Sequence, residues 1–281
     1  EQYNCAHLVD RALGYGMEGH RLEGNNILEV YANLLSIVNS MRENPRPVLV
    51  EFETFRMRGH EEASGTKYVP QELMDQWALK DPLETYATFL REQQVLTQEY
   101  ETALKSKIQD EINENLTLAF DEPKIQSTES NELNDVFQES VFEVIKQGEE
   151  KEELRFVDAV AQGLAQAMEH HDDLVIMGQD IAEYGGVFKI TEGLFEKYGP
   201  GRVRNTPICE SAILSAAMGL SINGFKSVVE MQFADFVSSG FNPIVNYLAK
   251  SHYRWGQNAD VVVRMPCGAG VGAGPFHSQT N

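Results

Sequence analysis

An acidic, polar segment interrupts the chain near its middle. Residues 121–153 contain eleven Asp and Glu residues against three lysines, so they carry eight of the twenty net negative charges of the 281-residue chain. Such a composition buries little apolar surface and is typical of a solvated linker, with a short helix predicted inside it at Val136–Ile145. The segment therefore favours two domains in one chain, at residues 1–120 and 154–281.

Apolar runs of strand length alternate with helical patterns on both sides of this linker. In the first domain, Ile27–Met41 has apolar residues at helical spacing behind a cap at Asn25 and Asn26, and residues 47–52 form a buried-strand pattern. Further helices are expected in this domain at 5–15, near 71–78, at 82–94 and on to about 120. In the second domain we expect strands at 174–177, 228–232 and 261–265, with helices at 154–169, 194–198, 211–220 and 244–251. This alternation predicts the α/β class with doubly wound parallel sheets.

The overall charge and the cysteines limit the function classes. The chain carries a net charge of −20, which argues against generic binding to nucleic acid or to an anionic membrane surface. No run approaches the length of a membrane span. Cys5, Cys209 and Cys267 lie far apart, which argues against a disulfide framework or a thiolate metal site and fits a reducing cytoplasm. His170 and His171 are interpreted as surface residues, so no metal ligands are predicted within the chain.

Two arginines and a histidine follow the predicted strand of the first domain. Arg56, Arg58 and His60 lie in a stretch that begins at the carboxyl end of that strand, where open α/β sheets bind ligands. A local anion site suited to phosphate is one interpretation of these side chains. An ordinary basic turn at the surface is the other.

Three residues of the second domain are candidates for chemistry. Glu210 precedes the small, apolar helix pattern at 211–220, where a carboxylate is either a helix cap or a buried acid. Phe236, like Phe233, fits either the core or a platform for a flat cofactor ring. His277 follows a glycine-rich run that lacks the GxGxxG spacing of a dinucleotide-binding loop. This histidine is either a proton carrier or a solvated loop residue.

Five short motifs stand in a fixed order along the second domain: Met177-Gly178-Gln179-Asp180, Tyr184-Gly185-Gly186-Val187-Phe188-Lys189, Thr206-Pro207-Ile208-Cys209-Glu210, Gln232-Phe233-Ala234-Asp235-Phe236 and His277-Ser278-Gln279. In this order they resemble the beta subunit of the thiamine-diphosphate-dependent decarboxylating dehydrogenase of 2-oxo acid dehydrogenase complexes. The first domain looks like the end of that enzyme's alpha subunit, through the segments Arg11–Gly16, Glu23–Tyr31 and Lys80–Pro82.

The resemblance implies an alpha–beta fusion with two thiamine-diphosphate-binding-type, doubly wound parallel-sheet domains. Residues 1–120 would be the C-terminal part of an alpha-type, diphosphate-binding domain. Residues 121–153 would be the acidic linker, and residues 154–281 a beta-type, pyrimidine-binding domain.

The resemblance also implies roles for single residues toward thiamine diphosphate. Glu210 would lie against the ring nitrogen of the aminopyrimidine and promote the proton transfer that activates the cofactor. Phe236 would pack on the pyrimidine ring, and His277 would shuttle protons while the acyl group passes to lipoyl. His60 would contact the diphosphate and the reacting centre, with Arg56 beside it.

The sequence departs from the family pattern at several points. Gln179 stands where the family usually has a glutamate. That glutamate is proposed to couple protons between two active sites, so this coupling is not expected in the present chain. Glu61 stands where mitochondrial relatives have a phosphorylatable serine, so kinase control is not expected there. The Gly-Asp-Gly…Asn motif that holds Mg²⁺ is expected upstream of Glu1, and a carboxyl-terminal beta domain is expected after Asn281. Both domains are therefore expected to be incomplete.

The activity implied by the resemblance is oxidative decarboxylation of a 2-oxo acid, with transfer of the acyl group to lipoyl on a partner dihydrolipoyl acyltransferase core. Branched-chain acids such as 3-methyl-2-oxobutanoate are favoured, because Gln232–Asp235 and Asn205–Pro207 are most like that branch. Pyruvate or acetoin dehydrogenases, a transketolase-like transferase and a non-catalytic scaffold are the alternatives. We expect a cytoplasmic homodimer or pseudo-heterotetramer that binds neither nucleic acid nor membrane.

Overall fold

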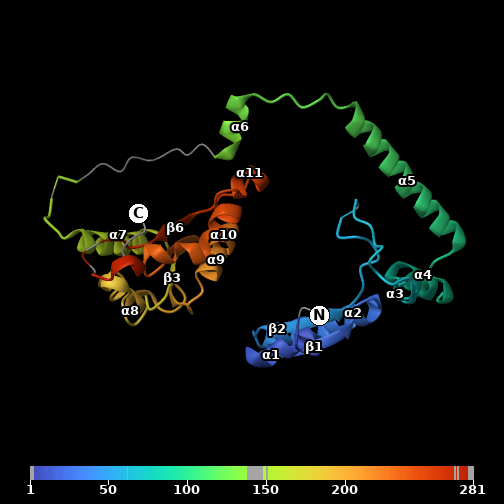
Figure 1. Ribbon diagram of the computed structural model, residues 1–281, viewed down its shortest axis with the longest axis horizontal. Helices are drawn as coiled ribbons and strands as arrows, with labels where there is room; N and C mark the ends of the chain where they lie inside the picture. Colours follow the sequence, from blue (N-terminus) through green and yellow to red (C-terminus); the bar gives the residue numbers. More distant parts are fainter. Residues whose placement is uncertain are drawn as a thin grey trace. The chain divides into compact units, whose positions relative to one another are not determined.

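The structure is a computed structural model that describes residues 3–61, 63–137, 148–149, 151–268, 270 and 272–277. It divides into two compact units, Glu1–Pro123 and Lys124–Asn281, which are described here one at a time (Figure 1). No helix within the described ranges is both long enough and apolar enough to cross a membrane.

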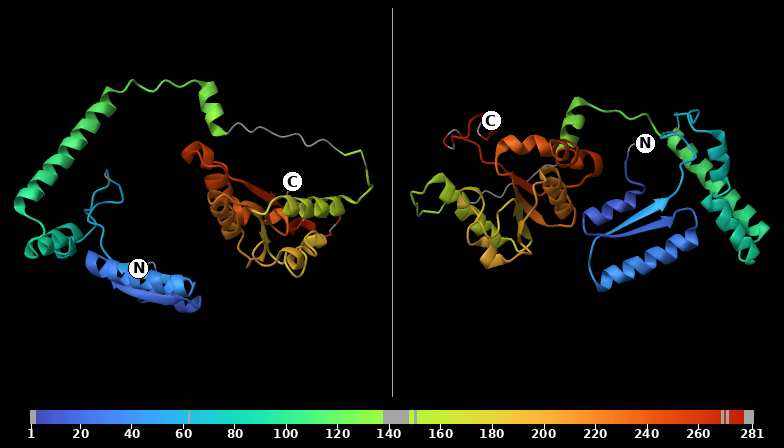
Figure 2. Two further views of the ribbon diagram at one scale, coloured as in Figure 1. Left: turned by 180° about the vertical axis from the view of Figure 1, so that it is seen from behind. Right: turned by 60° about the horizontal axis from the view of Figure 1, so that its bottom comes forward.

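The first unit contains a two-stranded parallel sheet. Strand β1 (Glu18–Glu23) pairs with β2 (Val48–Glu53), and α2 (Ile27–Glu43) connects them. The Asn26 side chain accepts hydrogen bonds from the first-turn amides of α2, which confirms the predicted cap and helix. In Figure 2 the two strands lie between α1 (Arg11–Gly14) and α2. Together β1, α2 and β2 form one unit of the parallel α/β type.

Three further helices complete the first unit. They are α3 (Gln71–Ala78), α4 (Pro82–Glu92) and α5 (Gln98–Asp121). Their beginnings follow from the sequence, because Asp81 caps α4 ahead of a proline at the first helical position and Thr97 caps α5.

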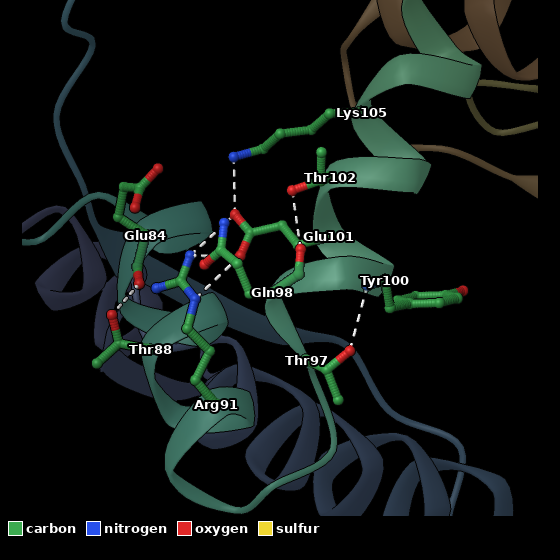
Figure 3. Close-up of polar contacts among 9 residues, drawn as sticks. All are labelled: Glu84, Thr88, Arg91, Thr97, Gln98, Tyr100, Glu101, Thr102 and Lys105. Atoms are coloured by element: carbon green, nitrogen blue, oxygen red, sulfur yellow. Dashed lines mark hydrogen bonds and ion pairs between the residues drawn. The ribbon is translucent and has the colours of Figure 1, made fainter.

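Glu101 joins α5 to α4 (Figure 3). The Glu101 carboxylate accepts hydrogen bonds from Arg91 Nη2, at 2.8 Å, and from Lys105 Nζ, at 2.7 Å. These partners hold the pKa of Glu101 below its ordinary value, and the hydrogen bond from Lys105 is the largest cause. A carboxylate with a lowered folded-state pKa stabilises the fold above its unfolded pKa, and this contribution is lost as the pH falls through the folded value.

We therefore expect Glu101→Gln to lower the denaturation midpoint of the first unit at pH 7. The deficit should shrink as the pH falls from 4.5 through the lower folded-state pKa of Glu101, because the wild-type side chain is then protonated too. Trp77 stacks on Phe55 within this unit, so its fluorescence in a Trp255→Phe background reports the unfolding. Glu99→Gln on the same turn is the matched control. An equal effect of both variants at all pH values would contradict the assigned role of Glu101.

A short helix, α6 (Glu129–Val136), begins the second unit behind a Thr128 cap, and it contacts α11 (Ser251–Trp255). It lies just before the helix predicted at Val136–Ile145, most of which falls outside the described residues.

The second unit is built on a four-stranded parallel sheet. The strand order is β4-β3-β5-β6, so the chain leaves β3 to one side and then crosses to the other, which makes the sheet doubly wound. The strands are β3 (Leu174–Gly178), β4 (Val203–Asn205), β5 (Lys226–Glu230) and β6 (Val261–Arg264). The helices are α7 (Phe156–His170), α8 (Leu194–Tyr198), α9 (Glu210–Ile222), α10 (Phe241–Pro243) and α11.

Two secondary-structure predictions for the second unit need correction. Strand β5 begins and ends two residues earlier than predicted. The single helix predicted at 244–251 is instead a series of turns: α10 leads into a π-helical turn over Ile244–Leu248, and α11 begins separately at Ser251. The apolar spacing over this stretch favours an ordinary α-helix, because π-helical turns are rare and occur mostly as single turns within α-helices.

The core of the second unit lies on both faces of its sheet. Neighbouring strand residues point to opposite faces, so Ile176 belongs to one buried cluster and Met177 to the other. Helices α7 and α8 contribute to the first cluster and α9 to the second (Figure 1). A sheet covered on both faces explains why β3 is apolar at every position.

Candidate functional site

The carboxyl ends of β3, β4, β5 and β6 define one edge of the sheet. The order in which strands are added to the sheet reverses between β3 and β5, and open α/β sheets bind ligands at such a switch point. All three predicted site residues of the second unit follow strands of this sheet. Glu210 comes after β4, Phe236 after β5 and His277 after β6.

Glu210 is the first residue of α9, and its side chain is buried, with 9% of its surface exposed. Gln179, directly after β3, donates a hydrogen bond from Nε2 to Glu210 Oε1 at 3.3 Å. A helix N-terminus favours negative charge, because its first amides have no carbonyl partner within the helix. The N-cap of α9 is Cys209 and no side chain caps the helix, so of the two alternatives Glu210 is the buried acid and not the cap.

His277 lies against two phenylalanine rings. The centroid of its ring lies 5.4 Å from that of Phe236 and 4.9 Å from that of Phe233, and both pairs of rings meet edge to face. Phe236 belongs to a 3-10 helix, η3 (Ala234–Gly240), that begins just after Phe233. The structure therefore brings together two predicted site residues and adds Phe233, for which the sequence pattern favoured a place in the core.

Backbone hydrogen bonds between neighbouring loops hold this edge together. The Thr206 amide donates to the Gly178 carbonyl at 2.8 Å, which links the segment before Glu210 to the end of β3. The Ala234 amide donates to the Pro266 carbonyl at 3.0 Å, which links η3 to the chain that leads toward His277. A shallow hollow beside the start of α9 is lined by Cys209, Glu210, Ser211, Ala212, Ser215 and Ser239.

A buried ion pair lies at the same end of the sheet. Glu230 and Arg264 are register partners on β5 and β6, and the guanidinium donates to Glu230 Oε2 through Nε at 3.0 Å and also through Nη2. Only 1% of the Glu230 side chain is exposed. Burial raises the pKa of Glu230, while the charge and hydrogen bond of Arg264 act in the opposite direction.

Arg56 and His60 belong to the first unit, on the segment after β2. Both side chains are exposed. His60 Nδ1 lies 3.0 Å from Ser64 Oγ, and this hydroxyl also donates to Glu61 Oε1 at 3.1 Å. Gly59 permits this tight turn, since a Cβ at that position would lie 2.3 Å from the Ser64 carbonyl oxygen. Sequence reasoning missed Ser64 as the partner of His60.

The donors and acceptors of the second unit fit an aminopyrimidine. A buried carboxyl group forms a hydrogen bond with a ring nitrogen by sharing a proton with it, and aromatic rings at the same edge of the sheet offer contacts to a flat ring. Among the residues that the structure describes, no group of three or more histidine, cysteine, aspartate or glutamate side chains is placed to hold a metal ion.

Comparisons with known proteins give matches for both units. Residues 1–128 match the dehydrogenase E1 component family, and residues 152–281 match the transketolase pyrimidine binding domain. A 2-oxoisovalerate dehydrogenase subunit beta of Pseudomonas aeruginosa is 40% identical over 129 residues, or 45% of this chain and 37% of that protein. A pyruvate dehydrogenase E1 component subunit beta of Acholeplasma laidlawii is 41% identical over 128 residues, or 45% and 39%.

The chain therefore spans about two fifths of the length of the curated relatives it matches. Among solved structures, the inactive beta4 tetramer of a split-gene transketolase matches 38% of this chain and 32% of its own, at 22% identity. The TM-score of this match is 0.31. Residues 1–128 are therefore similar to the dehydrogenase E1 component family, and residues 152–281 to the transketolase pyrimidine binding domain and to these beta subunits.

Proposed function

We propose that the protein containing this chain decarboxylates a 2-oxo acid oxidatively on thiamine diphosphate and delivers the acyl group to lipoyl on a partner acyltransferase. The observation that carries the proposal is the buried Glu210 at the start of α9, on the same sheet edge as the contact between Phe236 and His277. Thiamine diphosphate, when bound, supplies the carbanion chemistry that the protein's own side chains lack.

Glu210 has the first role in this proposal. Its carboxyl group would donate a proton to the pyrimidine ring nitrogen, and the resulting carboxylate would accept the hydrogen bond from that N–H while the cofactor is activated. Burial strengthens this hydrogen bond, because little water competes for the carboxylate oxygens. The first amides of α9 keep negative charge favourable at this position.

Phe236 and His277 have the other roles in the second unit. Phe236 would pack on the pyrimidine ring and exclude water from it. His277 would move a proton at its ring nitrogen during acyl transfer, a step suited to an imidazole, which can both accept and donate a proton. In the first unit, His60 and Arg56 would bind the diphosphate.

Branched-chain 2-oxo acids are the favoured substrates. The motif at 232–235 supports this choice, and one relative is named a 2-oxoisovalerate dehydrogenase. Another relative is named a pyruvate dehydrogenase, so pyruvate is the second candidate. The three widely spaced free cysteines support a cytoplasmic location.

A substrate panel tests the proposal. The complete protein, supplied with thiamine diphosphate and Mg²⁺, is assayed with 3-methyl-2-oxobutanoate, pyruvate and acetoin, each with an artificial electron acceptor and then with a lipoyl domain. We expect the highest kcat/KM for the branched-chain acid, and acylation of the lipoyl domain. Transfer of a two-carbon unit between sugar phosphates, without lipoyl acylation, would instead favour a transketolase-like enzyme. No turnover in either assay would favour a scaffold.

A further inference from the structure

The backbone around Gln179 is tightly constrained, and its side chain is buried beside the candidate site. It follows Gly178 at the end of β3, and only 6% of its surface is exposed. A Cβ at Gly178 would lie 2.8 Å from the Glu230 carbonyl oxygen, so β3 and β5 approach closely at this point. Asp180, the next residue, has a φ of 55°, so the chain turns in the left-handed region directly after Gln179.

The hydrogen bond from Gln179 connects two elements that end at the same sheet edge. Nε2 reaches from the end of β3 to Glu210 Oε1 at the beginning of α9. The Thr206 amide bonds the Gly178 carbonyl at 2.8 Å, so the backbones on either side of this side-chain bond are also connected. The amide of Gln179 is thus held where it donates to the carboxylate.

The chemistry of an amide limits what this contact does. A carboxamide NH₂ donates hydrogen bonds and has no proton that titrates near neutral pH. It fixes the orientation of the Glu210 carboxylate through Oε1 and leaves Oε2 for another donor. A carboxyl group in the same place would instead compete with Glu210 for a proton.

We propose that Gln179 is a positioning residue that orients the Glu210 carboxylate toward a ring nitrogen of the ligand. The inference rests on the proposed function, because it takes the pyrimidine ring of thiamine diphosphate as the partner of Glu210. A merely structural role, in which Gln179 only satisfies a buried carboxylate, is the competing explanation.

A cycle of protein and ligand variants separates these explanations. The complete protein is compared with Gln179→Met, which keeps the length of the side chain but removes the donor. Each binds thiamine diphosphate and an analogue with carbon in place of the ring nitrogen that Glu210 would contact. The matched control is Gln232→Met, because Gln232 donates to the Asp180 carboxylate at 3.4 Å and has no bond to Glu210. Dissociation constants come from quenching of intrinsic fluorescence, and thermal midpoints are recorded in parallel.

We expect Gln179→Met to weaken binding of thiamine diphosphate about tenfold, as the loss of one hydrogen bond to a charged group would. Binding of the analogue should change less than about twofold, and Gln232→Met should leave both affinities unchanged. Equal losses for the two ligands, or no loss for either, would overturn the positioning role. If the wild type binds both ligands equally, the contact between Glu210 and the ring nitrogen is absent, and the proposed function fails instead.

Discussion

Glu210→Gln is expected to reduce 2-oxo acid decarboxylation by about 10²–10⁴-fold, the range over which a positioned proton-transfer group acts. The amide keeps the shape of the side chain and its place at the start of α9, but it cannot hold and return the proton. Because the step is proton transfer and not substrate binding, the loss should appear in kcat, with little change in KM. Steady-state assays of the complete protein with saturating thiamine diphosphate measure both constants.

Glu183→Gln is the matched control for this variant. Glu183 is an exposed carboxylate at the same sheet edge, where its Oε2 accepts a hydrogen bond from Asn205 at 2.8 Å. Its replacement should leave kcat within about twofold, as for a surface change away from the chemistry. Retained activity in Glu210→Gln would remove the enzymatic role of this carboxylate.

Arg264→Met is expected to destabilise the second unit by about 3–5 kcal/mol near neutral pH, as is found when one partner of a buried ion pair is removed. Without the guanidinium, Glu230 remains 99% buried with no cation to oppose the effect of burial. The pKa of Glu230, already raised above its ordinary value, should therefore rise further in this variant.

The stability lost in Arg264→Met should depend on pH, and the raised pKa of Glu230 fixes the direction of that dependence. An acid with a raised folded-state pKa stabilises the fold fully below its unfolded value, here 4.5, and this contribution is lost as the pH rises through the folded value. The deficit of Arg264→Met should therefore be small near pH 4 and grow toward pH 7. Hydrogen exchange of the β3 and β5 amides measures the stability of this unit.

Arg204→Met provides a comparison within the same sheet, because Arg204 is an exposed residue of β4. Its effect should stay within about 0.5 kcal/mol at every pH. If the stability lost in Arg264→Met is the same at pH 4 and at pH 7, protonation of Glu230 is not coupled to folding, and the prediction is wrong.

The sequence predicted the elements that have strong local signals. Helix α2 carries both an apolar face and an asparagine cap, and β3 is apolar at every position. Strand β1 was missed because Glu18–Glu23 is mostly charged or polar, and its pairing comes from the neighbouring β2. Strand β4 was missed because three residues are too few to show an alternation. In both cases tertiary pairing outweighs local preference.

The sequence identified the candidate site residues but not the contacts between them. Glu210, Phe236 and His277 stood out by their motifs, and their roles stay predictions. The hydrogen bond from Gln179 to Glu210 and the contact of Phe233 with His277 could not be predicted. Which loops meet depends on the order of the strands in the sheet, and the alternation of strands and helices leaves that order open.

The strand order also has a consequence for how the chain folds during synthesis. In the first unit β1 pairs with a strand 30 residues away, whereas Leu174 of β3 pairs with Lys226, a separation of 52 residues. Because β3 is apolar throughout, it leaves the ribosome with an exposed hydrophobic surface well before β5 is available to cover its edge. Closing so long a loop is slow relative to local pairing. The second unit is therefore the part of the nascent chain that we expect chaperones to protect.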